Sequence, residues 1–555
     1  MPPNAFRQLT LVAFALFSPQ PGSSAQVKLG KTTLTGTALP GLYGEFFGGI
    51  PYAEPPVGDL RFARPVPKFS LGNATTFDAT QFGNSCPQPA SPFTPADLPM
   101  SEDCLNLNVF RPAGLAPAKS VPVMVWIFGG SFFTGTAESF NASSLIARSV
   151  VRGTPIIYVS FNYRLGPLGF PQGPEASSKG VLNLGLRDQV LALEWVHANV
   201  QAFGGDPTKV TVFGQSAGAV SISLLWLNDV FSTLARAAIF ESGEAGTTGI
   251  FDPNKSLPQW SVFVNSTPTC GPDTSIDDAF SCLRAASSDQ IAAAGLAGLG
   301  AMVGEFPFFP VLDGPEGLIP ALPSDLLKSG AGNQVPFISG SVLDDGTLFV
   351  ALSSTISSTS QIVDQLNSSF YPCTSQSTLQ NTIDTLLDLY PDIPALGCPF
   401  DTGNNTFGIS PVFKQAAALI GDLVIQAPRR FWSQTASEQG TKVYSYLFTD
   451  PQPENPPFLG VAHLSEIPYV YGDITVAANG TGPGTLSLIM QDYWISFATS
   501  LDPNDGKGLA RPNWEAYSVE QRVIQLNSTN TEMIADDFRQ DGIAYLSENA
   551  ALFCQ

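Results

Sequence analysis

The chain has 555 residues, of which 44% are hydrophobic and 13% are charged, and its formal net charge is −21 at pH 7. The hydrophobic fraction is too high for a disordered or collagen-like polymer and is sufficient for a large buried core. The negative charge would repel phosphate backbones and anionic membrane surfaces, which argues against nucleic-acid binding. Because charged residues are about half as frequent as in typical soluble proteins, we expect glycans to help solvate the surface.

The first residues resemble a secretory signal peptide. Arg7 precedes an apolar run at residues 9–17, and the small residues Ser23, Ser24 and Ala25 follow. The alternative is a membrane anchor, but the run has about half of the ~20 residues that a spanning helix needs. We therefore expect residues 1–25 to be a signal peptide and the protein to be secreted, with no integral membrane segment.

Glycosylation and cysteine patterns fit a secreted protein. Eight Asn-x-Ser/Thr sequons begin at Asn73, Asn141, Asn254, Asn265, Asn367, Asn404, Asn479 and Asn527. The seven cysteines are Cys86, Cys104, Cys270, Cys282, Cys373, Cys398 and Cys554. They allow three disulfides with one cysteine left over, and the sequence alone does not determine the pairing. None of the cysteine or histidine spacings is typical of a zinc site, so we expect no structural metal.

Short apolar runs alternate with helical patterns along the chain. Residues 27–53 indicate a small antiparallel meander. Buried strands are expected at residues 123–128, 156–161, 209–213, 238–241, 335–339 and 443–448, and two clear helices at residues 186–201 and 216–227. This alternation predicts an α/β fold with a large, mostly parallel sheet and helices on both faces. Because we find no internal repeat or low-complexity linker, we expect residues 26–555 to form a single domain.

The sequence around Ser216 predicts a catalytic nucleophile. The segment Gly214-Gln215-Ser216-Ala217-Gly218 lies between a predicted strand and a predicted helix. A serine at a sharp strand-to-helix turn needs glycines two residues before and after it, where any side chain would collide across the turn. The alternative is a tight turn with an incidental serine. The flanking strand and helix favour the nucleophile.

A serine hydroxyl needs a base to take its proton, and in esterase chemistry that base is normally histidine. The chain has two histidines. His197 lies in the middle of the helix predicted at residues 186–201, where a surface or boundary position is favoured. His463 lies on a predicted loop after a strand, and catalytic groups collect on such loops. We therefore predict that His463 is the general base.

A carboxylate is needed to orient the imidazole and to stabilise its positive form. Asp344 and Asp345 follow the strand predicted at residues 335–339. With either of them, the chain order is serine, acid, histidine, which is the order of α/β-hydrolases and differs from those of chymotrypsin and subtilisin. A turn or helix-capping role is the alternative for each aspartate.

The tetrahedral intermediate of ester hydrolysis needs backbone donors for its oxyanion. The amide of Ala217 is the first expected donor. The others should come from a glycine-rich turn after an earlier strand, and Gly129-Gly130-Ser131 fits that position. The alternative is a simple Gly-Gly hairpin.

Taken together, these motifs resemble the type-B carboxylesterase/lipase family, which contains cholinesterases, carboxylesterases and the large secreted fungal lipases and sterol esterases. The resemblance covers nearly the whole mature chain. It is carried by residues 47–53, 60–62, 102–106, 162–164, 183–189, 203–207, 213–218, 310–314 and 494–498, and by Asp345-Gly346 and His463. It implies an α/β-hydrolase fold with a small N-terminal antiparallel sheet, and ester hydrolysis without a cofactor.

The resemblance also implies roles for individual residues. Ser216 would be the nucleophile, Asp345 the acid and His463 the base. The oxyanion donors would be Gly130, Ser131 and Ala217. Disulfides would join Cys86 to Cys104 and Cys270 to Cys282, and structural ion pairs would join Arg61 to Glu102 and Arg164 to Asp206. Pairing Cys373 with Cys398 is our own guess from the remaining cysteines, and it would leave Cys554 free.

Four features depart from the family pattern. The usual acid is glutamate, so the shorter Asp345 must lie closer to His463, and Asp344 could compete; we favour Asp345. Ser131 replaces a glycine, which backbone donation should tolerate. Gln215 replaces a common glutamate, which makes a quaternary-ammonium substrate less favourable. The short loop between Cys86 and Cys104 disfavours an interfacially activated lipase.

We therefore expect a secreted serine carboxylesterase that hydrolyses neutral, fairly apolar esters. Candidate walls of the substrate pocket, for which core packing is the alternative, are Phe132, Phe133, Phe306, Phe308 and Phe309. The alternatives within the enzyme class are a lipase or sterol esterase and a feruloyl-type esterase. A non-catalytic adhesion relative is a remote alternative, because such proteins typically lose the serine or histidine that this chain retains.

Overall fold

The computed structural model describes residues 25–90, 94–95, 97–272, 274–300, 308–330, 335–352, 356–370, 373–477 and 480–555. Residues 1–24 of the expected signal peptide, the pocket candidate Phe306 and the sequon residue Asn479 lie outside the described residues.

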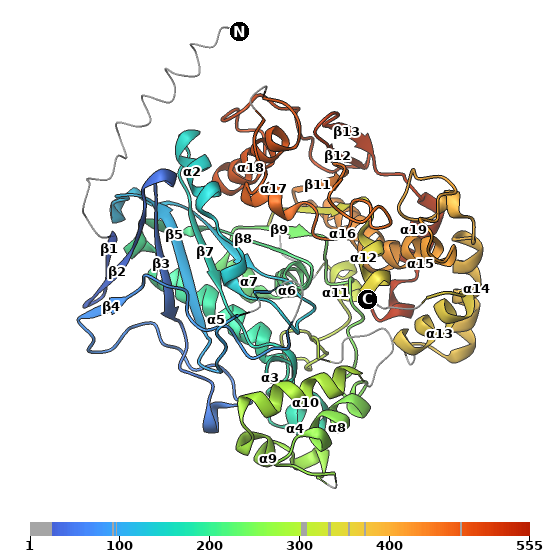
Figure 1. Ribbon diagram of the computed structural model, residues 1–555, viewed down its shortest axis with the longest axis horizontal. Helices are drawn as coiled ribbons and strands as arrows, with labels where there is room; N and C mark the ends of the chain where they lie inside the picture. Colours follow the sequence, from blue (N-terminus) through green and yellow to red (C-terminus); the bar gives the residue numbers. More distant parts are fainter. Residues whose placement is uncertain are drawn as a thin grey trace.

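The described strands form one thirteen-stranded sheet (Figure 1). Its order is β1-β2-β3-β5-β7-β6-β8-β9-β10-β11-β12-β13, with β4 paired to β2. The strands are β1 (Ala25–Leu29), β2 (Thr32–Leu39), β3 (Gly44–Pro51), β4 (Thr76–Asp78), β5 (Asn106–Pro112), β6 (Val121–Ile127), β7 (Ile157–Phe161), β8 (Gly205–Gln215), β9 (Ala237–Glu241), β10 (Phe337–Val342), β11 (Val443–Phe448), β12 (Arg522–Leu526) and β13 (Glu532–Ala535). Neighbours from β7 to β12 are parallel, whereas β1-β2-β3-β5-β7 and β12-β13 pair antiparallel.

Burial explains why the central strands read as continuous apolar runs. Every residue of β7, β9, β10 and β11 is buried. Strands covered on both faces need apolar residues at every position, whereas β1 alternates buried and exposed residues as a strand with one solvated face does. The predicted sheet with helices on both faces and a small antiparallel part at its N-terminal end is therefore confirmed.

Helices surround this sheet and extend beyond one end of it (Figure 1). They are α2 (Ser143–Val151), α3 (Gly166–Gly169), α4 (Gly173–Ser178), α5 (Leu184–Asn199), α6 (Ala217–Trp226), α7 (Asp229–Leu234), α8 (Leu257–Ser266), α9 (Phe280–Ala285), α10 (Ser288–Gly300), α11 (Pro323–Lys328), α12 (Asp345–Leu352), α13 (Thr359–Phe370), α14 (Gln376–Leu389), α15 (Val412–Gly421), α16 (Ala427–Glu438), α17 (Ile467–Tyr471), α18 (Pro483–Ser500) and α19 (Gln540–Glu548). A second hydrophobic cluster lies among α12 to α16 and α19, and includes Leu366, Leu379, Leu419 and Ile543.

The predicted elements shift by a few residues at their ends. The strand predicted at residues 443–448 coincides with β11, whereas β10 begins two residues later than predicted and ends three later. Strand β8 begins four residues earlier, because Gly205 pairs with Val121 of β6 ahead of the apolar run. Helix α6 begins at Ala217, one residue after the predicted start, since Ser216 adopts a backbone conformation that is not helical.

The cysteine pairing corrects one expectation. Disulfides join Cys86 to Cys104 and Cys270 to Cys282, the pairs that the family resemblance implies. Our guess that Cys373 pairs with Cys398 is wrong, because Cys373 is bonded to Cys554 and Cys398 is a buried free cysteine. The C-terminal segment packs against the end of α13, where the rings of Phe370 and Phe553 lie 5.1 Å apart, and this brings Cys554 across 181 residues of sequence.

The expected ion pairs are half correct. Arg61 forms a buried pair with Glu102. Arg164 pairs instead with Asp188, whose two carboxylate oxygens accept from Nε and Nη2 at 2.8 and 2.7 Å. Asp206 pairs with Lys209 at 2.8 Å. Arg164 follows the C-terminal end of β7 and Asp206 lies at the N-terminal end of β8, so these two parallel strands hold them at opposite edges of the sheet.

The described residues contain no membrane-spanning helix and no cluster of metal ligands. Among those residues, no helix combines the length and apolarity that crossing a bilayer requires. Within the same ranges, no group of three or more His, Cys, Asp or Glu side chains could hold a metal ion.

Candidate active site

Ser216 occupies a strained turn between β8 and α6. Its backbone angles are φ 56° and ψ −128°, in a region that side chains other than glycine rarely adopt, at a cost on the order of 1–3 kcal/mol. Two hydrogen bonds hold the turn: the Ser216 amide donates to the carbonyl of Glu241, and the Val220 amide donates to the carbonyl of Ser216, both at 2.9 Å. The turn leaves the half-buried Ser216 accessible to a ligand.

Glycines allow this turn to pass against the neighbouring strand. A Cβ atom at Gly214 or Gly218 would collide with the carbonyl oxygen of Ile127, the last residue of β6. A Cβ atom at Gly243 would meet the carbonyl oxygen of Ser216 itself. The glycines on either side of Ser216 therefore serve close backbone contact, as the sequence pattern predicts.

Asp345 and His463 are in direct contact. Nδ1 of His463 lies 2.6 Å from Oδ1 of Asp345, and both residues are buried. The other carboxylate oxygen of Asp345 accepts from the Val342 amide at 3.0 Å and from the Ser242 hydroxyl at 3.4 Å. The ring of Phe349 packs 4.7 Å from the imidazole. These contacts orient the carboxylate toward Nδ1 and restrict rotation of the imidazole.

Asp344 faces away from the imidazole and performs a different task. Its Oδ1 accepts from the Phe400 amide at 2.9 Å and from the Cys398 thiol at 3.2 Å. Its Oδ2 accepts from the Val461 amide at 2.9 Å, two residues before His463. Burial raises the pKa of Asp344. Asp344 therefore anchors the loop that carries His463, whereas Asp345 contacts the ring.

The second imidazole nitrogen contacts a residue that the sequence did not single out for this position. Nε2 of His463 lies 3.0 Å from Nε2 of the Gln215 amide. Among the described residues, no hydrogen bond joins the Ser216 hydroxyl to His463. The side chains of Ser216 and Gln215 both border Gly129, because a Cβ atom there would lie 2.9 Å from Cβ of Ser216 and 3.3 Å from Oε1 of Gln215. The predicted nucleophile and base thus lie at one site without a direct bond.

A turn of left-handed residues lies beside Ser216. Gly130, Ser131 and Phe132 have φ angles of 110°, 56° and 60°. The amides of Phe133 and Thr134 both donate to the carbonyl of Gly130 at 3.0 Å and hold the turn. Within the described part of the chain, the amides of Gly130, Ser131 and Ala217 have no acceptor. These are the three donors that the family resemblance implies.

The aromatic candidates divide between a crevice and the core. Phe133 lines an apolar crevice together with Leu165, Leu168 and Ile291. Its ring stacks on Phe308 at 5.9 Å. The remaining rings pack internally: Phe308 against Trp260 and Phe263, Phe309 against Phe251, and Phe132 against Phe170. Among the described candidates, Phe133 is thus the one that borders this open space.

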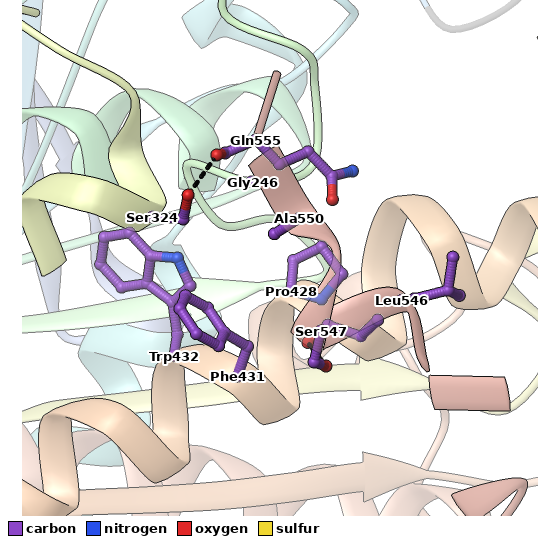
Figure 2. Close-up of a pocket in the computed structure, with 10 residues that line it drawn as sticks. Gly246, Ser324, Pro428, Phe431, Trp432, Leu546, Ser547, Ala550 and Gln555 are labelled. Carbon is purple, nitrogen blue, oxygen red and sulfur yellow. Dashed lines mark hydrogen bonds between the residues drawn. The ribbon is translucent and has the colours of Figure 1, made fainter. Parts of the chain in front are cut away.

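His197 and a second crevice lie outside this site. His197 is exposed on α5, as its position in the predicted helix indicates. The crevice in Figure 2 lies between Pro428, Phe431 and Trp432 of α16 and the C-terminal segment, and none of Ser216, Asp345 and His463 lines it. There the Ser324 hydroxyl donates to the carbonyl oxygen of Gln555 at 2.6 Å.

Three buried glutamates near Asp345 escaped the sequence reasoning. Burial raises the pKa of Glu241 and of Glu244 to about 8, and it raises the pKa of Glu466 well above its usual value. Each has a carboxylate oxygen without a hydrogen-bond partner in the described residues. In the sequence, Glu241 ends an apolar strand, Glu244 follows that strand by three residues, and Glu466 follows His463 by three residues. A raised pKa favours the protonated, uncharged form of each of these carboxyl groups near neutral pH.

Comparison with known proteins places this geometry in context. A model of the "Carboxylesterase family" matches residues 23–543. "Lipase 4" of Diutina rugosa is 35% identical over 579 residues, which cover 98% of this chain and 100% of the lipase. "Secreted lipase 1" of Botryotinia fuckeliana is 34% identical over 538 residues, which cover 92% and 90%. The crystal structure of Aspergillus niger EstA is similar with a TM-score of 0.81 and 25% identity, over 97% of this chain and 100% of EstA.

The buried Glu244 predicts a pH dependence of stability. Its folded pKa of about 8 lies above the ordinary 4.5, so the unfolded chain loses this proton first as the pH rises. Below pH 4.5 Glu244 is protonated in both the folded and the unfolded state, so it does not make the free energy of unfolding depend on pH. Between pH 4.5 and 8 the free energy of unfolding falls as the pH rises, by up to ~1.4 kcal/mol per pH unit. We expect Glu244→Gln to remove this part of the decline.

Urea denaturation of the wild type and Glu244→Gln at pH 5, 6, 7 and 8 measures this effect. The matched control is Glu520→Gln, because Glu520 is exposed. The control should follow the wild-type curve, while the Glu244→Gln curve should be flatter. Parallel curves for all three proteins would show that Glu244 is ionised in the folded state.

Proposed function

Because the chain belongs to the carboxylesterase family and is a carboxylic ester hydrolase, we propose that Ser216, His463 and Asp345 are its catalytic residues and act through an acyl-enzyme. The contact between Nδ1 of His463 and Oδ1 of Asp345, beside the strained Ser216 turn, is the observation that carries this proposal. A carboxylate at Nδ1 selects the tautomer whose Nε2 is free of a proton. That nitrogen can then accept the proton of the Ser216 hydroxyl.

In the first half of the reaction, Ser216 Oγ attacks the ester carbonyl while His463 Nε2 takes the hydroxyl proton. The carbonyl oxygen becomes an oxyanion, and the amides of Gly130, Ser131 and Ala217 donate to it. Among the described residues these amides have no other acceptor, and losing one such donor typically costs about 3 kcal/mol of transition-state stabilisation. The imidazolium then gives its proton to the leaving alkoxide, and the acyl group remains on Ser216.

In the second half, water attacks the acyl carbonyl and His463 accepts its proton. The same three amides stabilise the second oxyanion. The proton returns from His463 to Ser216 Oγ as the carboxylic acid leaves. Both halves start from the neutral imidazole, so the proposal requires activity to fall in acid as His463 becomes protonated.

The substrates that the site favours are neutral esters with an apolar acyl group. Gln215 carries no charge next to His463, and the turn that follows β6 continues into Phe133, whose ring borders the apolar side chains of Leu165, Leu168 and Ile291. A lipase is the second candidate, because the two relatives described above are named lipases. A sterol esterase or a feruloyl-type esterase remains a narrower version of the same reaction.

Secretion is part of the same proposal. One of the relatives is named a secreted lipase, and the matched family region begins at residue 23, close to the end of the expected signal peptide. Of the described sequons, those at Asn73, Asn141, Asn254, Asn265 and Asn404 are exposed. We propose that these asparagines carry N-linked glycans in a host that glycosylates.

The first prediction concerns the catalytic residues. Ser216→Ala and Asp345→Asn should each lower kcat/KM by about 10⁴-fold or more, because one removes the nucleophile and the other the tautomer-selecting carboxylate. Asp344→Asn is the matched control: it should lower the free energy of unfolding by about 1–3 kcal/mol, because buried acceptors are lost. Rates per folded enzyme for this variant should stay within about tenfold of wild type. Unchanged turnover in Ser216→Ala, or equal losses at both aspartates, would contradict the assignment.

The second prediction concerns substrate charge and chain length. Acetylcholine and 3,3-dimethylbutyl acetate have nearly the same shape but differ in charge, and we expect the neutral ester to have the higher kcat/KM. Rates on p-nitrophenyl butyrate, emulsified long-chain triglyceride, cholesteryl oleate and methyl ferulate then separate esterase, lipase, sterol esterase and feruloyl esterase. A preference for the cationic ester would refute a site built for neutral substrates.

The third prediction concerns glycan sites. Peptide mapping after an amidase converts each glycosylated asparagine to aspartate should mark the five exposed sequons. Asn527 should stay unmodified, because it is half-buried and its Nδ2 donates to the carbonyl and hydroxyl of Thr449 at 2.9 and 3.2 Å. Conversion at Asn527, or none at the exposed sites of the secreted protein, would overturn this assignment.

A further inference from the structure

We propose that Gln215 is a positioning residue whose amide donates a hydrogen bond to Nε2 of His463 and competes with the Ser216 hydroxyl for that nitrogen in the resting enzyme. This inference rests on the proposed function, because it assumes that Nε2 is the atom that takes the serine proton. It assigns a task to the residue that precedes the nucleophile, in addition to the absence of charge noted from the sequence.

The direction of this hydrogen bond follows from the other side of the ring. Nδ1 lies 2.6 Å from the carboxylate of Asp345, an acceptor, so Nδ1 carries the proton. The neutral imidazole then has a lone pair at Nε2. The atom of Gln215 that lies 3.0 Å from this lone pair is the amide nitrogen, a donor. Both ring nitrogens are therefore satisfied without the serine.

The surroundings hold the Gln215 side chain in this position. Gln215 is the last residue of β8, is 2% exposed, and pairs with Glu241 of β9. Its Oε1 lies on the side of Gly129, where a Cβ atom would be 3.3 Å away. The Gln215 side chain thus lies between Gly129, which precedes the turn at Gly130, Ser131 and Phe132, and the imidazole of His463.

Ser216 and Gln215 are adjacent in sequence and present two donors to one acceptor. The described structure gives the Ser216 hydroxyl no partner, whereas Nε2 is occupied by the amide. A lone pair that already accepts one hydrogen bond is less able to accept the serine proton, so the amide must leave before attack. Removing the amide donor should therefore increase the reactive fraction of the enzyme. A net hydrogen bond of about 1 kcal/mol corresponds to about fivefold.

The test uses Gln215→Met, which keeps the length and burial of the side chain but removes the donor, and Gln215→Leu as a second apolar variant. The matched control is Gln415→Met. Gln415 is equally buried and donates through Nε2 to the Tyr390 carbonyl at 2.7 Å, but it lies on α15, within the second hydrophobic cluster. If a change in activity came only from removing a buried amide, Gln415→Met would show the same change.

The first measurement is nitrogen NMR of the full chain with ¹⁵N-labelled histidine rings. The chain has two histidines, and His197→Gln assigns the exposed one. In the wild type we expect a neutral Nδ1–H tautomer for His463 with a hydrogen-bonded Nε2. The Gln215 variants are measured in a Ser216→Ala background, where no serine hydroxyl can replace the amide; there the Nε2 signal should move to the position of an unpaired ring nitrogen in Gln215→Met and Gln215→Leu, and should stay unchanged in Gln415→Met. An unchanged Nε2 signal in the Gln215 variants, or an Nε2–H tautomer in the wild type, would overturn the proposal.

The second measurement is the rate at which a small neutral p-nitrophenyl phosphonate modifies the enzyme at pH 8. The phosphorus atom bonds to Ser216 Oγ, p-nitrophenolate leaves, and the serine proton passes to His463. We expect Gln215→Met to react about fivefold faster than wild type and Gln415→Met to react at the wild-type rate. An equal or slower rate in Gln215→Met would refute the competition. Labelling of Ser216→Ala at the wild-type rate would instead refute the proposed nucleophile, so the two failures are distinguishable.

Discussion

The hydrogen bond between Asp345 and His463 is the interaction on which the rest of the site depends. It joins residues 118 positions apart, and it determines which ring nitrogen carries the proton. The availability of Nε2 to a serine, and the direction of the Gln215 contact, both follow from it. The two elements that carry these residues are themselves joined, since Asp344 accepts from the Val461 amide and donates its own amide to the Val461 carbonyl at 3.0 Å.

The sheet supplies the common origin of these residues. Ser216 follows β8, Asp345 follows β10, and the His463 loop comes after β11; all three strands are parallel. The C-terminal ends of parallel strands meet at one edge of the sheet, which is where α/β proteins bind ligands. The turn at Gly130, Ser131 and Phe132 follows β6, which pairs with β8, and therefore lies at the same edge of the sheet. Strong pairing in the buried core thus supports strained backbone at Ser216 and Ser131.

Burial of acidic groups shapes the electrostatics beneath this edge. Glu241, Glu244 and Glu466 are fully buried, and burial raises the pKa of each. A cluster of ionised carboxylates would stabilise the charged imidazole in the resting enzyme and remove the neutral base. The raised pKa values favour the protonated forms of these glutamates near neutral pH, and Asp345 is the carboxylate that contacts the ring.

The local sequence alone determined the type and approximate position of the elements, and it singled out Ser216, His463 and the glycine-rich turn as candidates. Continuous apolar runs and a serine between close-packed glycines reflect local constraints, because buried strands need apolar side chains and tight turns exclude Cβ atoms. The partners of residues that pair over long sequence distances could not be determined in this way. The family resemblance paired Arg164 with Asp206 and our own guess paired Cys373 with Cys398, and only the folded chain showed that Asp188 and Cys554 are the partners.

The same limit applies inside the site. Asp344 and Asp345 are adjacent and chemically identical; the family resemblance favoured Asp345, and the tertiary structure shows that the two side chains at the start of α12 have different partners, with Asp345 in contact with the imidazole. The contact of Gln215 with His463 likewise joins positions 248 residues apart. Local sequence determines which residues are buried and where backbone segments can pass close together. The choice among chemically equivalent partners depends on distances between residues far apart in the sequence, which only the tertiary structure sets.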